Sequence, residues 1–446
     1  MKINLGKSKS FFKSKISVSS YTKINSYNEE TEENENNKSR NNNLILFFVI
    51  IIFLILLFII SLIIIVFKFI IEPEMKEKKN KMNPEIYKIY NEKSKIKKYV
   101  DNCINGILSD EKKYKKSNNP KISIVIPVYN KERFILCVLR SIQNQSLKDI
   151  EIVFIDDYSH DSSTNLIEEY QKEDERIVLY KQETNRGTLR NRVDGGIKSK
   201  GEYILFLDCD DLLVQKNILK TIYAKAIKNK VDIVQFQAYH GDYYNSFIFY
   251  DNGHKTDPIY QPELSNLMYY EKGYLQLTES VIWGKLIKRN IFIETINSID
   301  EYYLNQHMIL HDDGLLLFIL FKKANSYLFI REYGMIYFYN DKSTMGNMRN
   351  KDKINKTARD CFLYLEFIFN YTNDTLYEKN MAVYQFKSYL NGFNDVYKKV
   401  TNGFDYIYKV LDLYLNCDII LKEDKVIIQQ VKEQFRLIES NLTSYL

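Results

Sequence analysis

Cysteine, tryptophan and histidine are scarce in this sequence of 446 residues, which has five Cys, one Trp and five His. The cysteines are odd in number and no two have the CxxC spacing, so neither a disulfide framework nor a zinc knuckle is expected. No HExxH pattern occurs, and His307 and His311 precede the helix on which they would have to share a face. The sequence therefore excludes a cysteine-stapled scaffold and does not favour a zinc centre.

An excess of basic residues is lacking in the part of the chain that is long enough to fold. The net charge is +6, but residues 1–43 carry +3, Lys68 carries +1 and residues 72–120 carry +5. Residues 121–446 are therefore left at about −3, without the basic surface that nucleic acid requires. Nucleic acid is not an expected partner.

Long hydrophobic runs are also rare, because only residues 44–67 form a stretch long enough to cross a bilayer. These 24 residues contain Ser61 as their only polar side chain, and as a helix they would reach roughly 36 Å against about 30 Å of hydrocarbon. The run begins too far into the chain, and is too long, for an ordinary cleaved signal peptide. We predict a single transmembrane helix at 44–67, a disordered polar tail over 1–43 and a Lys-rich stem over 68–120.

Short apolar runs alternate with amphipathic stretches beyond the stem. Strands are predicted at residues 122–126, 150–155, 177–180, 203–207 and 232–236. Helices are predicted near residues 131–144, 163–173, 188–199 and 215–228. Continuous apolar strands separated by helices are typical of an α/β domain in which a parallel sheet is covered on both faces. We assign this domain to residues 121–345 and predict a helical accessory region over 346–446.

Polar groups follow three of the predicted strands, at the edge where ligands bind in sheets of this kind. The first strand leads into Pro127–Asn130, and the second into an acidic turn with Asp156 and Asp157. The fourth strand is wholly apolar and leads into the run 208–211, which is Asp-Cys-Asp-Asp. Crowded carboxylates repel one another unless a cation compensates them, and hard oxygen ligands suit Mg²⁺ or Mn²⁺. An isolated Asp-x-Asp also occurs by chance, so this pattern is informative only because it follows a buried strand.

The segments ISIVIPVYN, VFIDDYSHD, NRGTLRNR and GEYILFLDCDD, in this order, resemble the family 2 glycosyltransferases, which have the GT-A fold. The resemblance covers roughly residues 121–339 and is strongest over 121–211. It implies a Rossmann-like, mostly parallel sheet flanked by helices. It also implies a transferase that takes a sugar from a nucleotide-sugar donor.

Roles for individual residues follow from the same resemblance. The turn formed by Pro127, Val128, Tyr129 and Asn130 would hold the nucleotide base together with the carboxylate of Asp157. Asp208 would meet the ribose, and Asp210 would bind the divalent cation, Mn²⁺ or Mg²⁺, that bridges the diphosphate. Arg192 stands where the family's loop arginine contacts the nucleotide, although the usual Ala-Arg-Asn is here Asn191-Arg192-Val193.

The family's catalytic base is an Asp in a Glu-Asp pair that lies well beyond the metal motif in the chain. Asp312 and Asp313 stand at this place, with Asp312 instead of the Glu, so the resemblance makes Asp313 the base. A carboxylate there can take the proton of an acceptor hydroxyl as the new bond forms. Asp312 and Trp283 are expected on the acceptor side, where Trp283 either packs in the wall as a structural residue or stacks on a sugar. Alternatively, both acids simply cap the helix that begins with them.

We therefore predict a metal-dependent, inverting glycosyltransferase that moves a sugar from a nucleotide-sugar, expected to be a UDP-sugar, to a hydroxyl of a glycan, lipid or protein. The alternative is a catalytically inactive GT-A domain that acts as a membrane-tethered binding or scaffold protein. Against it, Asp208, Asp210 and Asp313 are all present. A nucleotidyltransferase is disfavoured because no Gly-rich phosphate loop follows the first strand.

The side of the membrane on which the domain lies is open, because two patterns conflict. Five Lys follow the hydrophobic run closely and two basic residues precede it, which favours a cytosolic domain. Two points favour the lumen instead. With a cytosolic domain, six further Lys in the tail would have to cross the membrane, and the order of tail, anchor, stem and transferase resembles that of lumenal Golgi enzymes. Sequons at Asn355, Asn370, Asn373 and Asn441 permit a lumenal site. We expect the Golgi or ER lumen, with the cytosol as the alternative.

Overall fold

The computed structural model describes residues 114–242, 247–249, 256–264, 281–339, 351–372, 399–418, 420 and 422–443. The chain divides into two compact units, residues 1–91 and 92–446, and all the described residues belong to the second. The predicted tail, the predicted transmembrane helix at 44–67 and most of the predicted stem lie outside the described residues. Among the helices that the structure describes, none has the length and hydropathy needed to cross a bilayer.

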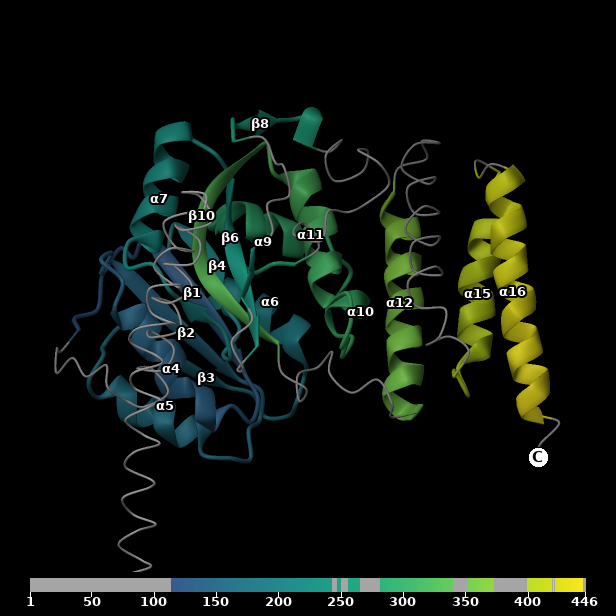
Figure 1. Cartoon of the computed structure of the whole chain (residues 1–446), viewed down its shortest axis with the longest axis horizontal. Helices are drawn as coiled ribbons and strands as arrows, with labels where there is room; N and C mark the ends of the chain where they lie inside the picture. The colour runs from purple at the N-terminus through teal and green to yellow at the C-terminus, as the bar shows by residue number, and fades with distance from the viewer. Residues whose placement is uncertain are drawn as a thin grey trace, which may run out of the picture. The chain divides into compact units, whose positions relative to one another are not determined.

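Ten strands in the described ranges form one sheet, in the order β3-β2-β1-β4-β9-β6-β10-β5, with β7 paired to β6 and β8 to β10 (Figure 1). Their bounds are β1 Ile122–Val128, β2 Ile150–Asp156, β3 Ile177–Lys181, β4 Tyr203–Phe206, β5 Leu212–Leu213, β6 Ile233–Asp242, β7 Phe247–Phe249, β8 Ile259–Tyr260, β9 Lys285–Lys288 and β10 Ser326–Tyr339. The five strands predicted from apolar runs are all present.

The sheet is mixed, which refines the prediction of a mostly parallel sheet. β1, β2, β3 and β4 are mutually parallel where they pair, and Val128 of β1 lies beside Asp156 of β2. β9 runs antiparallel to β4 and β6, and β10 runs parallel to β6 but antiparallel to β5. Because the parallel strands end at one edge, the polar residues that follow β1, β2 and β4 are brought together there.

Helices cover both faces of the sheet (Figure 1). One face is covered by α4 (Glu132–Gln143), α5 (Ser163–Gln171) and α7 (Ile218–Asn229), and the other by α6 (Thr188–Lys198), α9 (Arg289–Asn297) and α11 (Asp312–Lys323). Successive side chains of a strand point to opposite faces, and in β1 Ile124 and Ile126 belong to the first core whereas Val125 belongs to the second. This double cover explains why β1, β2 and β4 are largely apolar.

The C-terminal residues that the structure describes, from Lys351 onward, are mainly helical, as predicted. They form α12 (Lys351–Tyr371), α15 (Phe404–Leu415) and α16 (Lys422–Thr443). Their apolar faces, with Phe362, Tyr414 and Phe435 among the buried side chains, continue the core that α6, α9 and α11 make with the sheet. The short helix α10 (Glu301–Leu304) lies just before the segment that leads into α11.

Candidate active site

The turns after β1 and β2 are joined by hydrogen bonds. The backbone N–H of Asn130 donates to the hydroxyl of Ser159 (3.0 Å), and the side-chain oxygen of Asn130 accepts from the backbone N–H of His160 (2.8 Å). Asn130 has a φ of 52°, a left-handed conformation that Asn tolerates better than most residues. Tyr129 is 44% exposed beside it. The structure thus brings together the turn 127–130 and Asp157, the residues predicted to hold a nucleotide base.

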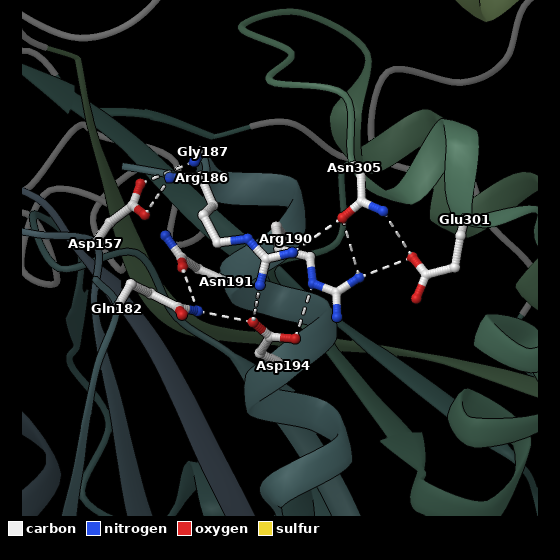
Figure 2. Close-up of polar contacts among 9 residues, drawn as sticks. All are labelled: Asp157, Gln182, Arg186, Gly187, Arg190, Asn191, Asp194, Glu301 and Asn305. Atoms are coloured by element: carbon white, nitrogen blue, oxygen red, sulfur yellow. Dashed lines mark hydrogen bonds and ion pairs between the residues drawn. The ribbon is translucent and has the colours of Figure 1, made fainter. Parts of the chain in front are cut away.

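Asp157 fixes the loop that enters α6 (Figure 2). Its two side-chain oxygens accept from the backbone N–H groups of Arg186 (2.7 Å) and Gly187 (2.9 Å), and the residue is buried. Gly187 has a φ of 85°, and a Cβ there would lie 2.5 Å from the ring of His307. Only glycine meets both conditions without strain. Asp157 therefore has a structural role in addition to any contact with a base.

A second carboxylate ties the same loop to α10 (Figure 2). Asp194 of α6 accepts from Gln182 (2.7 Å) and pairs with Arg186 (3.4 Å) and with Arg190 (2.9 Å). Both arginines continue across to α10: Arg190 donates to Glu301 (2.9 Å), and Arg186 to Asn305 just after the helix (2.9 Å). The loop that borders the donor side is thus held from two directions.

Arg192 lies at the centre of the site. Its guanidinium pairs with Asp208 after β4 (2.8 Å), with Asp312 (2.7 Å) and with Asp313 in the first turn of α11. The residue is 4% exposed. Burial alone would lower the pKa of Arg192, but the charges of Asp313, Asp208 and Asp312 outweigh burial and raise it. The buried guanidinium of Arg192 therefore joins Asp208, which follows β4, to Asp312 and Asp313 at the start of α11.

Three carboxylates around one guanidinium leave negative charge in excess. Burial raises the pKa of Asp313 to about 7; the charge of Arg192 opposes this rise, and those of Asp312 and Asp208 add to it. The second oxygen of Asp313 accepts from the backbone N–H of Ile282 (3.0 Å), which fixes its direction. Burial also raises the pKa of Asp312. A carboxyl group that titrates near neutral pH is suited to act as a general base.

Asp210 lies on the other side of the Asp-Cys-Asp-Asp turn and is paired with Lys131, at 2.6 Å between Nζ and Oδ2. Burial would lower the pKa of Lys131, but the charge and hydrogen bond of Asp210, together with the charge of Asp208 and the Cys209 thiol, outweigh burial and raise it. Asp211 is buried and accepts from the backbone N–H of Phe338 in β10 (3.0 Å), and burial raises its pKa well above the usual value. Asp211 thus links the turn to the sheet.

The donor set after β4 fits a Mg²⁺ or Mn²⁺ ion that substrate phosphates help to hold. Within the described ranges, no three His, Cys, Asp or Glu side chains are grouped so that they alone could bind a metal. Mg²⁺ commonly takes one or two carboxylates and completes its shell with phosphate oxygens and water. Asp210 offers such a carboxylate, 14% exposed, at the turn that also carries Asp208. The cation itself stays a prediction.

Trp283, predicted on the acceptor side, is 8% exposed and stacks on Tyr337 of β10 at 5.4 Å between ring centroids. It belongs to the core on the face covered by α4, α5 and α7. Its place in that core is settled, whereas contact with a sugar stays a prediction.

Sequence reasoning missed the ion pair of Lys131 with Asp210 and the structural role of Asp211. Lys131 follows directly after the predicted turn 127–130, so its position at the edge of the sheet could have been predicted. The contact of Asp211 with Phe338 could not be predicted from the sequence, because β10 is far away in the chain.

Comparison with known proteins indicates the same class of enzyme as the resemblance found in the sequence. The sequence model of the family described as "Glycosyl transferase family 2" matches residues 123–295. The chain is 27% identical over 272 residues to the cholesterol galactosyltransferase of Borreliella burgdorferi, covering 58% of this chain and 72% of the relative. It is 26% identical over 296 residues to the GalNAc(5)-diNAcBac-PP-undecaprenol beta-1,3-glucosyltransferase of Campylobacter jejuni, covering 66% and 87%.

A solved structure has the same fold at low sequence identity. Residues 1–349 of TarS from S. aureus, in complex with UDP-GlcNAc, superpose with a TM-score of 0.52 and 16% identity, covering 73% of this chain and 92% of TarS 1–349. The family match, the curated relatives and the fold agree on the class of enzyme. The chain is therefore a glycosyltransferase: its residues 123–295 match the family 2 glycosyltransferase model, and its described part has the α/β fold of TarS 1–349.

Proposed function

We propose that the chain is an inverting, metal-dependent transferase that moves a sugar from a UDP-sugar to a hydroxyl acceptor. The observation that carries the proposal is the cluster in which Arg192 joins Asp208 to Asp312 and Asp313. It places a carboxyl group with a pKa of about 7 next to the turn expected to bind the donor. A group of this kind, held between donor and acceptor, is what direct displacement requires.

In this proposal Asp313 takes the proton of the acceptor hydroxyl while the acceptor oxygen bonds to the anomeric carbon. The bond from that carbon to the diphosphate breaks on the opposite side, so the configuration inverts and UDP leaves. The backbone N–H of Ile282 and the guanidinium of Arg192 hold Asp313 in position. Arg192 is bound to three carboxylates, so we assign it this positioning role in place of the nucleotide contact expected from the resemblance.

The charge of the site supports the need for a cation. The site holds two basic side chains, Lys131 and Arg192, and both are paired with carboxylates. It holds five acidic side chains: Asp208, Asp210, Asp211, Asp312 and Asp313. A diphosphate would add further negative charge. When bound, a divalent cation at Asp210 would neutralise charge on the leaving diphosphate.

The donor class is supported by the relatives. TarS was solved with UDP-GlcNAc, and the names of the curated relatives specify galactosyl or glucosyl transfer to cholesterol or to a lipid-linked glycan. For this chain we propose a UDP-sugar donor and a glycan, lipid or protein hydroxyl as acceptor. Release of UDP from a panel of UDP-sugars, with the full chain purified in detergent, tests the donor.

Removal of the metal is expected to weaken UDP binding. Titration calorimetry with the full chain should give an affinity for UDP about tenfold or more higher with Mn²⁺ or Mg²⁺ than with EDTA, because Asp210 would help to hold a cation whose charge offsets that of the diphosphate. Asp210→Ala should abolish this difference. Asp161→Asn, at an acid of the same sheet edge that accepts from the backbone N–H of Glu132 and Ser163, should retain it. Equal affinities of the wild type in Mn²⁺ and in EDTA would contradict metal dependence.

We also propose that residues 44–67 anchor the enzyme in a membrane with the domain in the lumen; the sequence layout alone supports this. Asn370 and Asn441 are exposed sequons, although the amide of Asn370 donates to Tyr303. Expression in cells should give a glycosylated product whose gel mobility shifts on deglycosylation. The shift should be lost when Asn370, Asn373 and Asn441 are all replaced by Gln. Digestion of the C-terminal domain by protease added to intact microsomes would place the domain in the cytosol instead.

A further inference from the structure

The helix α12 contacts the segment that leads into the proposed base. Asp360 accepts a hydrogen bond from the backbone N–H of Ile309 (2.7 Å), and Arg359 donates to the side chain of Gln306 (2.7 Å). Lys356 donates to the backbone carbonyl of His307. Three polar side chains on consecutive turns of one helix thus hold residues 306–309, just before Asp312 and Asp313.

A ring of the same helix flanks the two acids on both sides. Tyr364 stacks on His311, the residue before Asp312, with ring centroids 5.0 Å apart and planes 13° apart. On the other side, a Cβ added at Gly314 would lie 3.1 Å from the ring of Tyr364. The residues before and after the pair Asp312–Asp313 are therefore both packed against α12.

The same segment reaches the donor side. The ring of His307 lies against Gly187, so closely that a Cβ on Gly187 would come within 2.5 Å of it. The backbone N–H of Gly187 in turn donates to Asp157. Residues 306–311 therefore lie between α12 on one side and both halves of the active site on the other.

The charge of the carboxylate at position 360 is disfavoured by burial. Asp360 is fully buried, and burial raises its pKa to about 6, against the hydrogen bonds from the backbone N–H groups of Ile309 and Leu310. A buried carboxylate is rarely better for stability than an apolar side chain of similar size. A carboxylate at position 360 is explained if its role is to accept hydrogen bonds from the backbone N–H groups of Ile309 and Leu310.

We propose that α12 of the accessory region is a positioning element of the active site, in which Asp360 fixes residues 306–311 and thereby the place of Asp313. The proposal rests on the role of Asp313 as the base. It gives the helical accessory region a function in the reaction, and it makes Asp360 a positioning residue that does not touch the substrate.

Asp360→Ala in the full chain tests the proposal by three measurements. Turnover, followed as UDP released from the UDP-sugar that the wild type uses fastest, should fall about tenfold, because small displacements of a reacting group are costly. The affinity for UDP should change by about twofold or less, because the donor contacts remain. Hydrogen exchange of residues 306–313, measured by mass spectrometry without donor, should become faster. Asp360→Asn keeps an accepting oxygen and should restore both turnover and protection.

The matched control is Glu366→Ala on the same helix. Glu366 accepts from Tyr406 (2.7 Å) and Lys409 (3.1 Å), so its loss disturbs the accessory helices but not residues 306–311. Turnover should then be unchanged. If Asp360→Ala fails to fold, the double variant Lys356→Ala, Arg359→Ala removes two of the contacts with the segment and should show the same changes, smaller in size.

Unchanged turnover and exchange in the variants of α12 would overturn the inference, as would an equal loss of turnover in Glu366→Ala. Failure of the proposed function is separable from these outcomes. In that case Asp313→Asn retains activity, while the exchange of residues 306–313 still reports whether α12 holds the segment.

Discussion

Asp313→Asn is expected to lower kcat by about 10²-fold or more while the affinity for UDP stays near that of the wild type. Asparagine keeps the size of the side chain and can still accept from the backbone N–H of Ile282. It cannot take a proton from an acceptor hydroxyl. Steady-state turnover and calorimetric titration with UDP, on the same preparation, separate the chemical step from donor binding.

The pH dependence of the wild type should report the same group. Burial raises the pKa of Asp313 to about 7, and only the ionised carboxylate can act as the base. Activity should therefore rise as the pH increases through about 7 and level off above it, and it should be lost as the pH falls below that value. This limb should be absent from the residual activity of Asp313→Asn.

Asp312→Asn is the matched control for this prediction, because Asp312 is the neighbouring acid and also pairs with Arg192. Its effect on kcat should be clearly smaller than that of Asp313→Asn. A larger loss in Asp312→Asn would transfer the role of base to Asp312. Full activity in both variants would show that neither Asp312 nor Asp313 is the base.

The parallel half of the sheet was predictable because its strands carry their signal locally. β1, β2 and β4 are buried on both faces, so each is a continuous apolar run followed by polar residues at one edge. The antiparallel β9 was missed, since its four residues Lys285–Lys288 include two lysines and show no apolar run. Such a strand is defined by its neighbours, β4 and β6, which no local pattern specifies.

The candidate site divides in a similar way. The strand-end carboxylates Asp157, Asp208 and Asp210 were found from their position after apolar strands. The pairing of Arg192 with Asp312 and Asp313 joins residues about 120 positions apart, so spacing in the sequence gives no access to it. The contact of Asp360 with Ile309 has the same character, because helical periodicity marks Asp360 only as a polar residue on a helix.

Arg192→Met is expected to lower the free energy of unfolding by about 3–5 kcal/mol at pH 8, the range found when one partner of a buried ion pair is removed. The substitution leaves the carboxylates of Asp208, Asp312 and Asp313 close together without the cation that joins them. Trp283 is the only tryptophan and is buried, so its fluorescence during urea unfolding measures the change. Activity should be lost as well, because Asp313 is no longer held.

The loss should shrink as the pH falls. Without Arg192, its charge no longer opposes the effect of burial, so the pKa values of Asp312 and Asp313 rise further above those of the unfolded chain. The folded state then binds protons more tightly than the unfolded state, so stability is regained as the pH decreases through the raised values. The difference from the wild type should therefore be largest at pH 8 and smallest near pH 5.

Two comparisons decide whether charge is the cause. Lys181→Met removes a cation at the end of β3 that is 50% exposed and whose partner Glu168 is 46% exposed, and should cost about 1 kcal/mol or less. Adding Asp312→Asn and Asp313→Asn to Arg192→Met removes two of the three uncompensated charges and should restore most of the stability, but not the activity. If the triple variant stays as unstable as Arg192→Met, and the loss does not depend on pH, the guanidinium contributes by packing. The carboxylates would then not need it as a counter-charge, and the raised pKa of Asp313 would have to come from burial alone.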